Sequence, residues 1–354
     1  MTSLAPDPTP PALAIEADPL DGPPRASSWA ERLMWTLAGI VLVNWAVDLL
    51  GSATSFWWAA VLTVLGGAWG VAVVIGSLLP IGQSAAARRY GNWCAWATAG
   101  VVVLMFLAWA AIQVHNSPQY GTDELAFDQY AAQLASHGAN PYVHLMHAAF
   151  PMFRVSPNGF TYTLSGHKVL ELSYPALSFL AYVPFLLIGW STEVAAAVNA
   201  GAWALTMLLL FAFLPRSTRP VALIIGSISV YIAYAVGGVT DALYVPLLLI
   251  AAYRWDDFGR HRWSYVAPVA LGLALAIKQT PWPLLPFLVG ALAYDEYDRS
   301  GDVRAALARA WRYLWIALCA FILPNLPYFV ASPGAWIRGT LTPLVQNLVP
   351  SGQG

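Results

Sequence analysis

The sequence predicts an all-α polytopic membrane protein with about 9 to 11 transmembrane helices and one long external loop. Three observations support this fold class. Only 10% of the 354 residues are charged, whereas soluble globular chains carry about 25%. Uncharged apolar runs such as Val101–Val114 approach the roughly 20 residues that cross a bilayer. One polar stretch, residues 115–173, interrupts these runs and holds five of the six histidines.

The first 28 residues are rich in Pro, Ala and Asp and show no hydrophobic period. Such a composition cannot bury a core, so we expect residues 1–28 to form a disordered cytoplasmic tail. The tail lacks a basic start, a short apolar core and a cleavage site, so we expect no cleaved signal peptide. Residues 29–354 then form one membrane domain that includes the external loop 115–173.

The candidate spans are apolar segments separated by polar turns, and several of them are short. In chain order they are Leu33–Leu50, Phe56–Leu79, Trp93–Val114, Tyr174–Trp190, Val194–Leu214, Val221–Gly237, Val239–Tyr253, Tyr265–Ile277, Trp282–Tyr294 and Tyr313–Ala331.

Arginine clusters orient the chain, because cytoplasmic loops are enriched in Lys and Arg. Arg88 and Arg89 place the second loop inside, and the third span then delivers the long loop to the outside. With the later arginine clusters also inside, only four of the 17 cations remain outside. The cations left outside are Arg154, Lys168, Lys278 and Arg338.

One conflict of parity remains between the long loop and the next cytoplasmic cluster at Arg216. Two apolar spans separate them, where an odd number is required. Either Val194–Leu214 is a broken or re-entrant pair of short helices, or Tyr174–Trp190 does not fully cross. The sequence leaves both alternatives open.

The long loop begins with an amphipathic helix. Thr122 can cap it, and Asp123 and Glu124 lie in its first turn, where carboxylates suit the positive helix end. An apolar stripe follows at helical spacing, and Gly138 is a stop signal. We expect this helix to lie on the outer membrane surface, and a purely capping role for the two carboxylates is the simpler alternative.

The rest of the loop contains two histidines that could bind a metal ion and a segment that could form a hairpin. His144 and His147 are three residues apart and could share a zinc ion, but no further ligand pattern accompanies them. Ordinary interfacial histidines are therefore favoured, no cofactor is predicted, and the sequence leaves metal dependence open. Residues 156–167 carry Pro, Asn and Gly with alternating apolar residues, which is typical of a small hairpin-like loop.

Lys278 is the clearest ionisable side chain at membrane depth, where such groups are functional candidates. It lies at the outer end of a short span, before the helix-breaking Pro281 and Pro283, and could bind a phosphate as a point charge. Snorkelling to the headgroups is the equal alternative. Asp241 occupies the preceding outer turn and could be a binding group, a partner of Lys278 or an ordinary turn residue.

Together these features resemble the GT-C superfamily of integral-membrane glycosyltransferases, and most closely the bacterial mannosyltransferases that use polyprenyl-phosphate mannose. The resemblance rests on Asp123-Glu124 in the first long external loop, then Tyr130, then Gly-x-x-Pro-Tyr at residues 138–142. A Tyr-Pro start to the next span at residues 174–175 and Lys278 near a proline add weaker support. It covers about residues 93–330, while the spans before the loop look added and the chain is short for the family.

The resemblance implies transfer of a sugar, mannose in the first place, from a polyprenyl-phosphate donor to a glycolipid or glycan of the cell envelope. It implies a bundle of the GT-C type in the bacterial cytoplasmic membrane, with the active site outside. Asp123 would be the general base, kept ionised by the helix start, with inversion at the anomeric carbon. Glu124 would orient a substrate. The donor phosphate would contact Lys278, His167 and Gln279, and the further substrate contacts would be Tyr130, Tyr142 and Asp241.

Two other functions remain as alternatives. A lipid-carrier flippase or transporter would also place charges at membrane depth, but such proteins often show internal repeats, and we find none. A non-catalytic assembly subunit would not need the acidic pair. The net charge of −1 points to no particular binding partner. We expect the protein to contact membrane lipids and not to bind nucleic acid.

Overall fold

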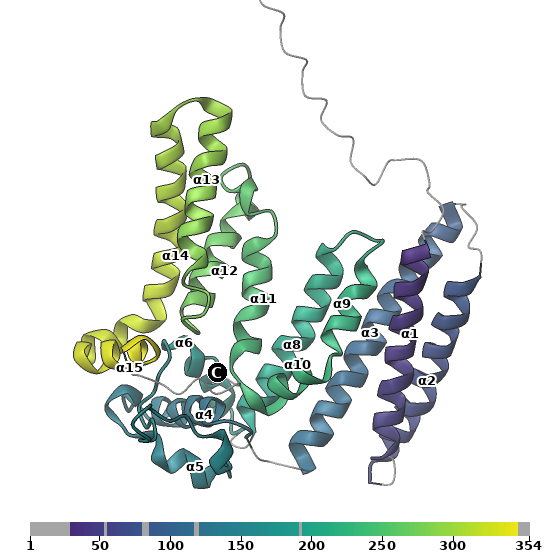
Figure 1. Cartoon of the computed structure of the whole chain (residues 1–354), viewed down its shortest axis with the longest axis horizontal. Helices are drawn as coiled ribbons and strands as arrows, with labels where there is room; N and C mark the ends of the chain where they lie inside the picture. The colour runs from purple at the N-terminus through teal and green to yellow at the C-terminus, as the bar shows by residue number, and fades with distance from the viewer. Residues whose placement is uncertain (1–28, 53–54, 80–84, 117–119, 191–192, 346–354) are drawn as a thin grey trace, which may run out of the picture.

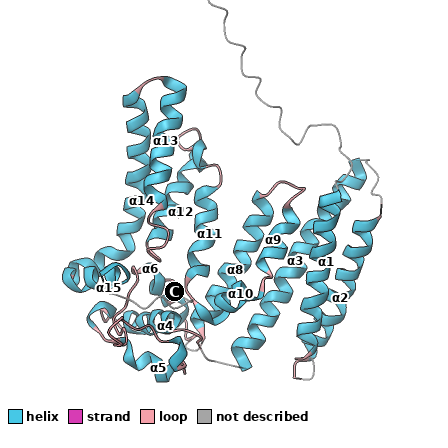
Figure 2. Ribbon diagram, in the orientation of Figure 1, coloured by secondary structure: helices cyan, strands magenta, loops and turns pink. Residues whose placement is uncertain are grey.

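The computed structural model describes residues 29–52, 55–79, 85–116, 120–190 and 193–345, so the predicted tail 1–28 lies outside it. Across these residues the chain is built of helices and loops (Figure 2), with one isolated β-bridge, Tyr162 to Lys168. The prediction of an all-helical fold is confirmed.

Five of the described helices are long and apolar enough to cross a membrane. They are α1 (Trp29–Leu50), α2 (Trp57–Leu78), α3 (Ala85–Asn116), α8 (Val194–Phe213) and α14 (Val303–Ala331). The pair Arg219–Gly226 and Ser229–Gly238 adds a sixth span if its 61° bend is counted as one broken helix. These helices fit a multi-pass membrane protein.

Three predicted spans form helices that are shorter or less apolar than this, namely α11 (Asp241–Ala252), α12 (Val266–Leu275) and α13 (Leu284–Ser300). Helix α11 packs on α8 and α12, and α14 packs on both α12 and α13 (Figure 1). Large apolar side chains such as Trp311 and Leu323 of α14 are exposed on the outside. An exposed apolar surface of this kind suits contact with lipid.

The parity conflict has a structural answer. Segment Tyr174–Trp190, predicted as a span, consists of two short helices, α6 (Leu177–Leu180) and α7 (Val183–Leu187). Pro184 lies in the first turn of α7, and Gly189 ends the segment with a φ of 91°. Pro184 has no amide hydrogen to donate to the carbonyl oxygen of Leu180, so α6 cannot continue regularly into α7. The positive φ of Gly189 ends the helical path. Helix α8 is continuous, which contradicts the first alternative and favours the second.

The predicted span Val221–Gly237 is divided into α9 (Arg219–Gly226), α10 (Ser229–Ala233) and the π-helical turn η4 (Tyr234–Gly238). Ile228 is extended and separates α9 from α10. The π turn leaves the carbonyl oxygen of Gly237 free to accept a hydrogen bond from the amide of Gly121, at 2.7 Å. Such turns are frequent at functional sites.

The predicted helix of the long loop is confirmed as α4 (Asp123–Ser136), and Gly138 follows it with a φ of 79°. Its polar side is buried as well as its apolar side, because α6, α7, α8 and η4 surround it. Helix α15 (Pro333–Val345) joins this layer through Asn325 of α14, whose side chain accepts from Trp336 at 3.1 Å. We call the layer formed by residues 120–190 around α4 the cap; α15 packs against it.

The arginine-rich turns lie at the opposite end of the bundle from the cap. Figure 1 shows the α8–α9, α11–α12 and α13–α14 connections at one end and α4, α5 (Ala149–Met152) and α15 at the other. This separation agrees with the sidedness expected from the arginine clusters.

At the arginine-rich end, buried Arg309 of α14 joins three segments. Its guanidinium donates to the carbonyl oxygen of Phe258 at 2.9 Å and to the carboxylates of Asp295 and Glu296, each at 3.0 Å. We expect Arg309→Ala to lower the free energy of unfolding by about 1–3 kcal/mol, because hydrogen bonds to charged groups are lost. Thermal unfolding in detergent checks this, with exposed Arg304→Ala as the control; equal losses in both variants would contradict it.

Candidate functional site

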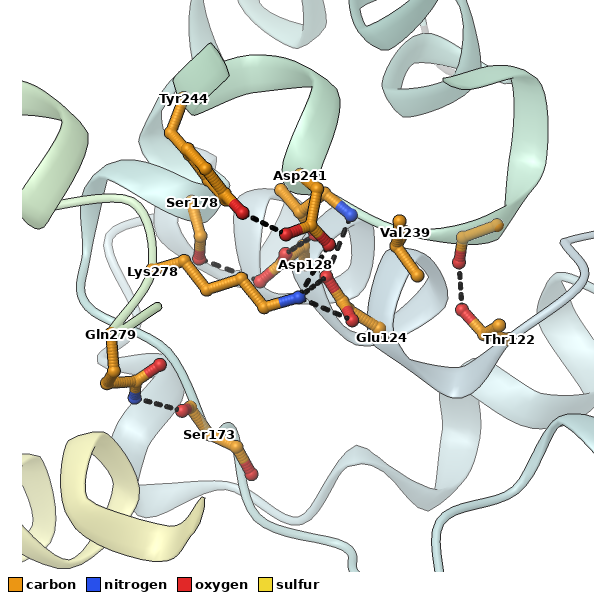
Figure 3. Close-up of polar contacts among 12 residues, drawn as sticks. Thr122, Glu124, Asp128, Ser173, Ser178, Val239, Asp241, Tyr244, Lys278 and Gln279 are labelled. Carbon is orange, nitrogen blue, oxygen red and sulfur yellow. Dashed lines mark hydrogen bonds and ion pairs between the residues drawn. The ribbon is translucent and has the colours of Figure 1, made fainter. Parts of the chain in front are cut away.

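Three charged side chains meet where the cap joins the bundle (Figure 3). The Lys278 ammonium lies 2.9 and 3.1 Å from the two carboxylate oxygens of Glu124 and 2.7 Å from Oδ2 of Asp241. Glu124 is in the first turn of α4, Asp241 begins α11, and Lys278 follows α12. Residues more than 150 positions apart in the sequence are thus paired.

The three side chains differ in exposure. Glu124 and Lys278 are 4% and 9% exposed, whereas Asp241 is 31% exposed. Burial alone would lower the pKa of Lys278, but the adjacent carboxylates raise it above its ordinary value, so the lysine is charged. Three roles were left open for Asp241. In the structure Asp241 is an ion-pair partner of Lys278.

Asp128 is a buried carboxylate that the sequence did not single out as a site residue. It accepts hydrogen bonds from the hydroxyls of Ser178, at 2.7 Å, and Thr240, at 2.6 Å. Burial raises its pKa to about 7, while the two hydroxyls act in the opposite direction. Its spacing of four residues from Glu124 puts both on one face of α4, and that spacing was the available signal.

Thr240 connects these carboxylates. Its amide donates to Glu124 at 2.8 Å while its hydroxyl donates to Asp128. The turn before α11 is therefore fixed to two consecutive turns of α4. Since Ser178 lies in α6, the network ties three elements of the site together.

Asp123 accepts from one residue at both carboxylate oxygens. The Thr161 amide donates to Oδ2 at 2.5 Å, and the Thr161 hydroxyl donates to Oδ1 at 3.1 Å. Burial raises the pKa of Asp123 to about 6, and the Thr161 bonds only partly offset this. The prediction that the helix start lowers this pKa was wrong, because desolvation outweighs the helix end.

Thr122 does not cap α4 through its side chain. Its hydroxyl donates to the carbonyl oxygen of Gly238 in η4 instead. Together with the Gly121 amide on Gly237, this bond anchors the start of α4 to the π turn. These two bonds fix the position of the first turn of α4, which carries Asp123 and Glu124, relative to η4.

The remaining predicted residues lie around the cluster in other roles. Gln279 donates to the carbonyl oxygens of Ser173, at 2.7 Å, and Thr340, at 2.6 Å, and so holds α15 against the cap. Buried Tyr142 donates to the carbonyl oxygen of Tyr174 at 2.7 Å. Half-buried Tyr130 packs against the core of the cap.

Three histidines of the long loop lie on exposed turns, whereas Lys278 is buried. His167 is exposed at a turn where its backbone pairs with Thr163. His144 and His147 are exposed on neighbouring short turns. Across the described residues, no group of three or more metal-ligating side chains is present.

The site therefore combines two kinds of group. Lys278 is a buried cation whose charge is balanced by Glu124 and Asp241. Asp123 and Asp128 form no salt bridge among the described residues, and burial raises their pKa values to about 6 and about 7.

Comparisons of the chain with protein-family models, with curated proteins and with solved structures gave no match.

Proposed function

We propose that this protein is an integral-membrane glycosyltransferase of the GT-C type, which transfers a sugar from a polyprenyl-phosphate donor to a glycolipid or glycan acceptor. Mannose is the first candidate sugar. The reaction takes place on the outer face of the bacterial cytoplasmic membrane, at the end of the bundle that carries the cap.

One observation supports this proposal: the first turn of α4 holds a buried carboxylate of raised pKa and the partner of a cation at adjacent positions. Asp123 has a pKa near neutrality, and Glu124 is paired with Lys278. Glycosyl transfer from a lipid phosphate needs one base for the acceptor hydroxyl and one positive charge for the departing phosphate.

The reaction proceeds by a single displacement. The acceptor hydroxyl gives its proton to the Asp123 carboxylate while its oxygen forms a bond to the anomeric carbon. The bond from that carbon to the phosphate oxygen breaks, and the polyprenyl phosphate leaves with the electron pair and its added negative charge. Lys278 stabilises that charge by exchanging Asp241, its more exposed partner, for the phosphate. One displacement inverts the anomeric configuration.

The test is transfer in membranes that contain the expressed protein. Radiolabelled polyprenyl-phosphate mannose is supplied with a total envelope extract, and incorporated label is compared with membranes lacking the protein. Label above this background, with inverted linkage, supports the proposal. Polyprenyl-phosphate arabinose is the second donor, and absence of transfer from both donors would reject a glycosyltransferase.

A lipid-carrier transporter is the second candidate, because two carboxylates are already held against Lys278. Buried ionisable networks also serve as proton relays in transporters. Reconstituted vesicles distinguish the two functions: a transporter moves the intact labelled lipid between leaflets, whereas a glycosyltransferase consumes it.

We expect the transfer rate to fall as pH decreases through about 6. Protonated Asp123 cannot accept the acceptor proton, so the rate should drop about tenfold for each pH unit below that value. Initial rates between about pH 4.5 and 8 check this, after correction for unfolded protein at each pH. A rate that stays constant to the acid end of this range would show that Asp123 is not the base.

A further inference from the structure

A loop of the cap lies directly over the start of α4. We call residues 156–168 the strap. It is closed by the bridge between Tyr162 and Lys168 and by the Thr163 amide, which donates to the carbonyl oxygen of His167 at 2.8 Å. The hairpin-like loop expected from the sequence is thereby confirmed. Arg154, just before the strap, has a φ of 51°, a backbone conformation that large side chains rarely adopt.

The strap encloses Asp123. Thr161 donates to both carboxylate oxygens through its amide and its hydroxyl, and Asp123 is only 5% exposed. A general base must come within about 3 Å of the hydroxyl that it deprotonates. With the strap in this position, Thr161 and the burial of Asp123 restrict the approach of an external hydroxyl group to the carboxylate.

The contact between Thr161 and Asp123 is chemically the one expected of a substrate. An alcohol oxygen donates its proton toward one carboxylate oxygen, at 3.1 Å. A carbohydrate acceptor makes this contact with its base immediately before proton transfer. We propose, on the basis of the glycosyltransferase function above, that the Thr161 hydroxyl occupies the place of the acceptor hydroxyl, and that the acceptor reaches Asp123 by displacing the strap.

The attachment of the strap suits such an exchange. Gly159 packs directly on the backbone of Gly121 and Thr122, where a Cβ atom would clash. The Phe160 ring packs 4.1 Å from that of Phe150, while residues 164–168 are exposed. A segment held by few buried apolar contacts opens at low cost in free energy.

Kinetics of two matched threonine variants test the proposal. Thr161→Val keeps the shape and the amide donor but removes the competing hydroxyl, so the KM for the acceptor should fall by about threefold to tenfold. The acid limb of the pH profile should also move to higher pH, because a hydrogen bond that lowers the pKa of Asp123 is lost; Glu124 is the other ionisable neighbour that acts on it.

The control is Thr163→Val. The Thr163 hydroxyl lies in the same strap but contacts Ser165 and the His167 backbone rather than Asp123, so the pH profile should not change. Thr161→Ser, which keeps both donors, should behave like the wild type. An unchanged or higher KM in Thr161→Val, or the same shift of the pH profile in Thr163→Val, would overturn the proposal. If Thr161→Val does not fold, Thr161→Ala replaces it.

Amide hydrogen exchange of the wild-type protein provides a test that does not depend on transfer. In a detergent without a sugar headgroup, an alkyl mannoside should increase exchange of peptides within residues 156–168, whereas the corresponding alkyl alcohol should not. No increase with the mannoside would reject displacement of the strap.

The outcomes separate this inference from the proposed function. Faster exchange with mannoside but no transfer from either donor would leave the strap as the cover of a carbohydrate site and reject the glycosyltransferase. Transfer accompanied by unchanged exchange and unchanged kinetics in Thr161→Val would reject only the strap inference.

Discussion

Replacement of Asp123 by asparagine is expected to reduce sugar transfer by at least about 10²-fold, because a positioned general base contributes about 10² to 10⁴ in rate. The asparagine side chain has the size of the carboxylate. Its oxygen can still accept the hydrogen bond from the backbone amide of Thr161, which is 2.5 Å long in the wild-type protein. The fold should therefore persist. Initial rates at equal protein abundance in membranes measure the effect.

Asp298→Asn is the matched control, since this aspartate is exposed near the end of α13, far from the cap. It should transfer sugar at the wild-type rate. A loss of less than about tenfold in a folded Asp123→Asn variant would show that another group accepts the proton. Asp128, whose pKa is raised to about 7, would then be the first residue to replace.

Replacement of Lys278 by methionine is expected to lower the free energy of unfolding by about 3–5 kcal/mol, because it leaves the Glu124 carboxylate buried without its cation. Glu124 is 4% exposed, so water cannot take over the role of the ammonium group. Thermal unfolding and size-exclusion chromatography in detergent measure this loss. Transfer should be lost at the same time, since the departing phosphate has no positive charge beside it.

Two further variants identify the cause. Lys168→Met removes the other lysine of the chain, which is exposed in the strap and lies 4.2 Å from the centroid of the Phe160 ring. Because an exposed cation–π contact contributes about 0.5–1 kcal/mol, this variant should lose no more than about 1 kcal/mol. Adding Glu124→Gln to Lys278→Met removes the unpaired charge and should recover part of the stability. Strictly additive losses in the double variant would mean that the two residues do not depend on each other.

Sequence periodicity predicted α4 and its ends well. Asp123 in the first turn and Gly138 after the last turn are local features, and they appear where expected. The environment of α4 was not predictable in the same way. Its polar face, expected at the membrane surface, is buried because η4, α6 and α8 cover it, and these elements come from distant parts of the chain.

The same contrast explains the spans and the site. The apolar composition of Tyr174–Trp190 led to its prediction as a span. Pro184 and Gly189 explain why the segment is instead broken. Lys278, Glu124 and Asp241 could each be selected as ionisable groups in apolar surroundings. Their pairing, and the contact of Thr161 with Asp123, join residues 37 to 154 positions apart.

By itself, the sequence determined the helical class, five of the ten predicted spans as long apolar helices, the cap helix and most of the residues that carry charge into the site, because composition and period are local properties. Tertiary structure alone decided which charges neutralise each other and how far each carboxylate is desolvated. It therefore decided that Asp123 has a raised rather than a lowered pKa. Burial and charge pairing depend on neighbours brought together by folding, and no local pattern encodes them.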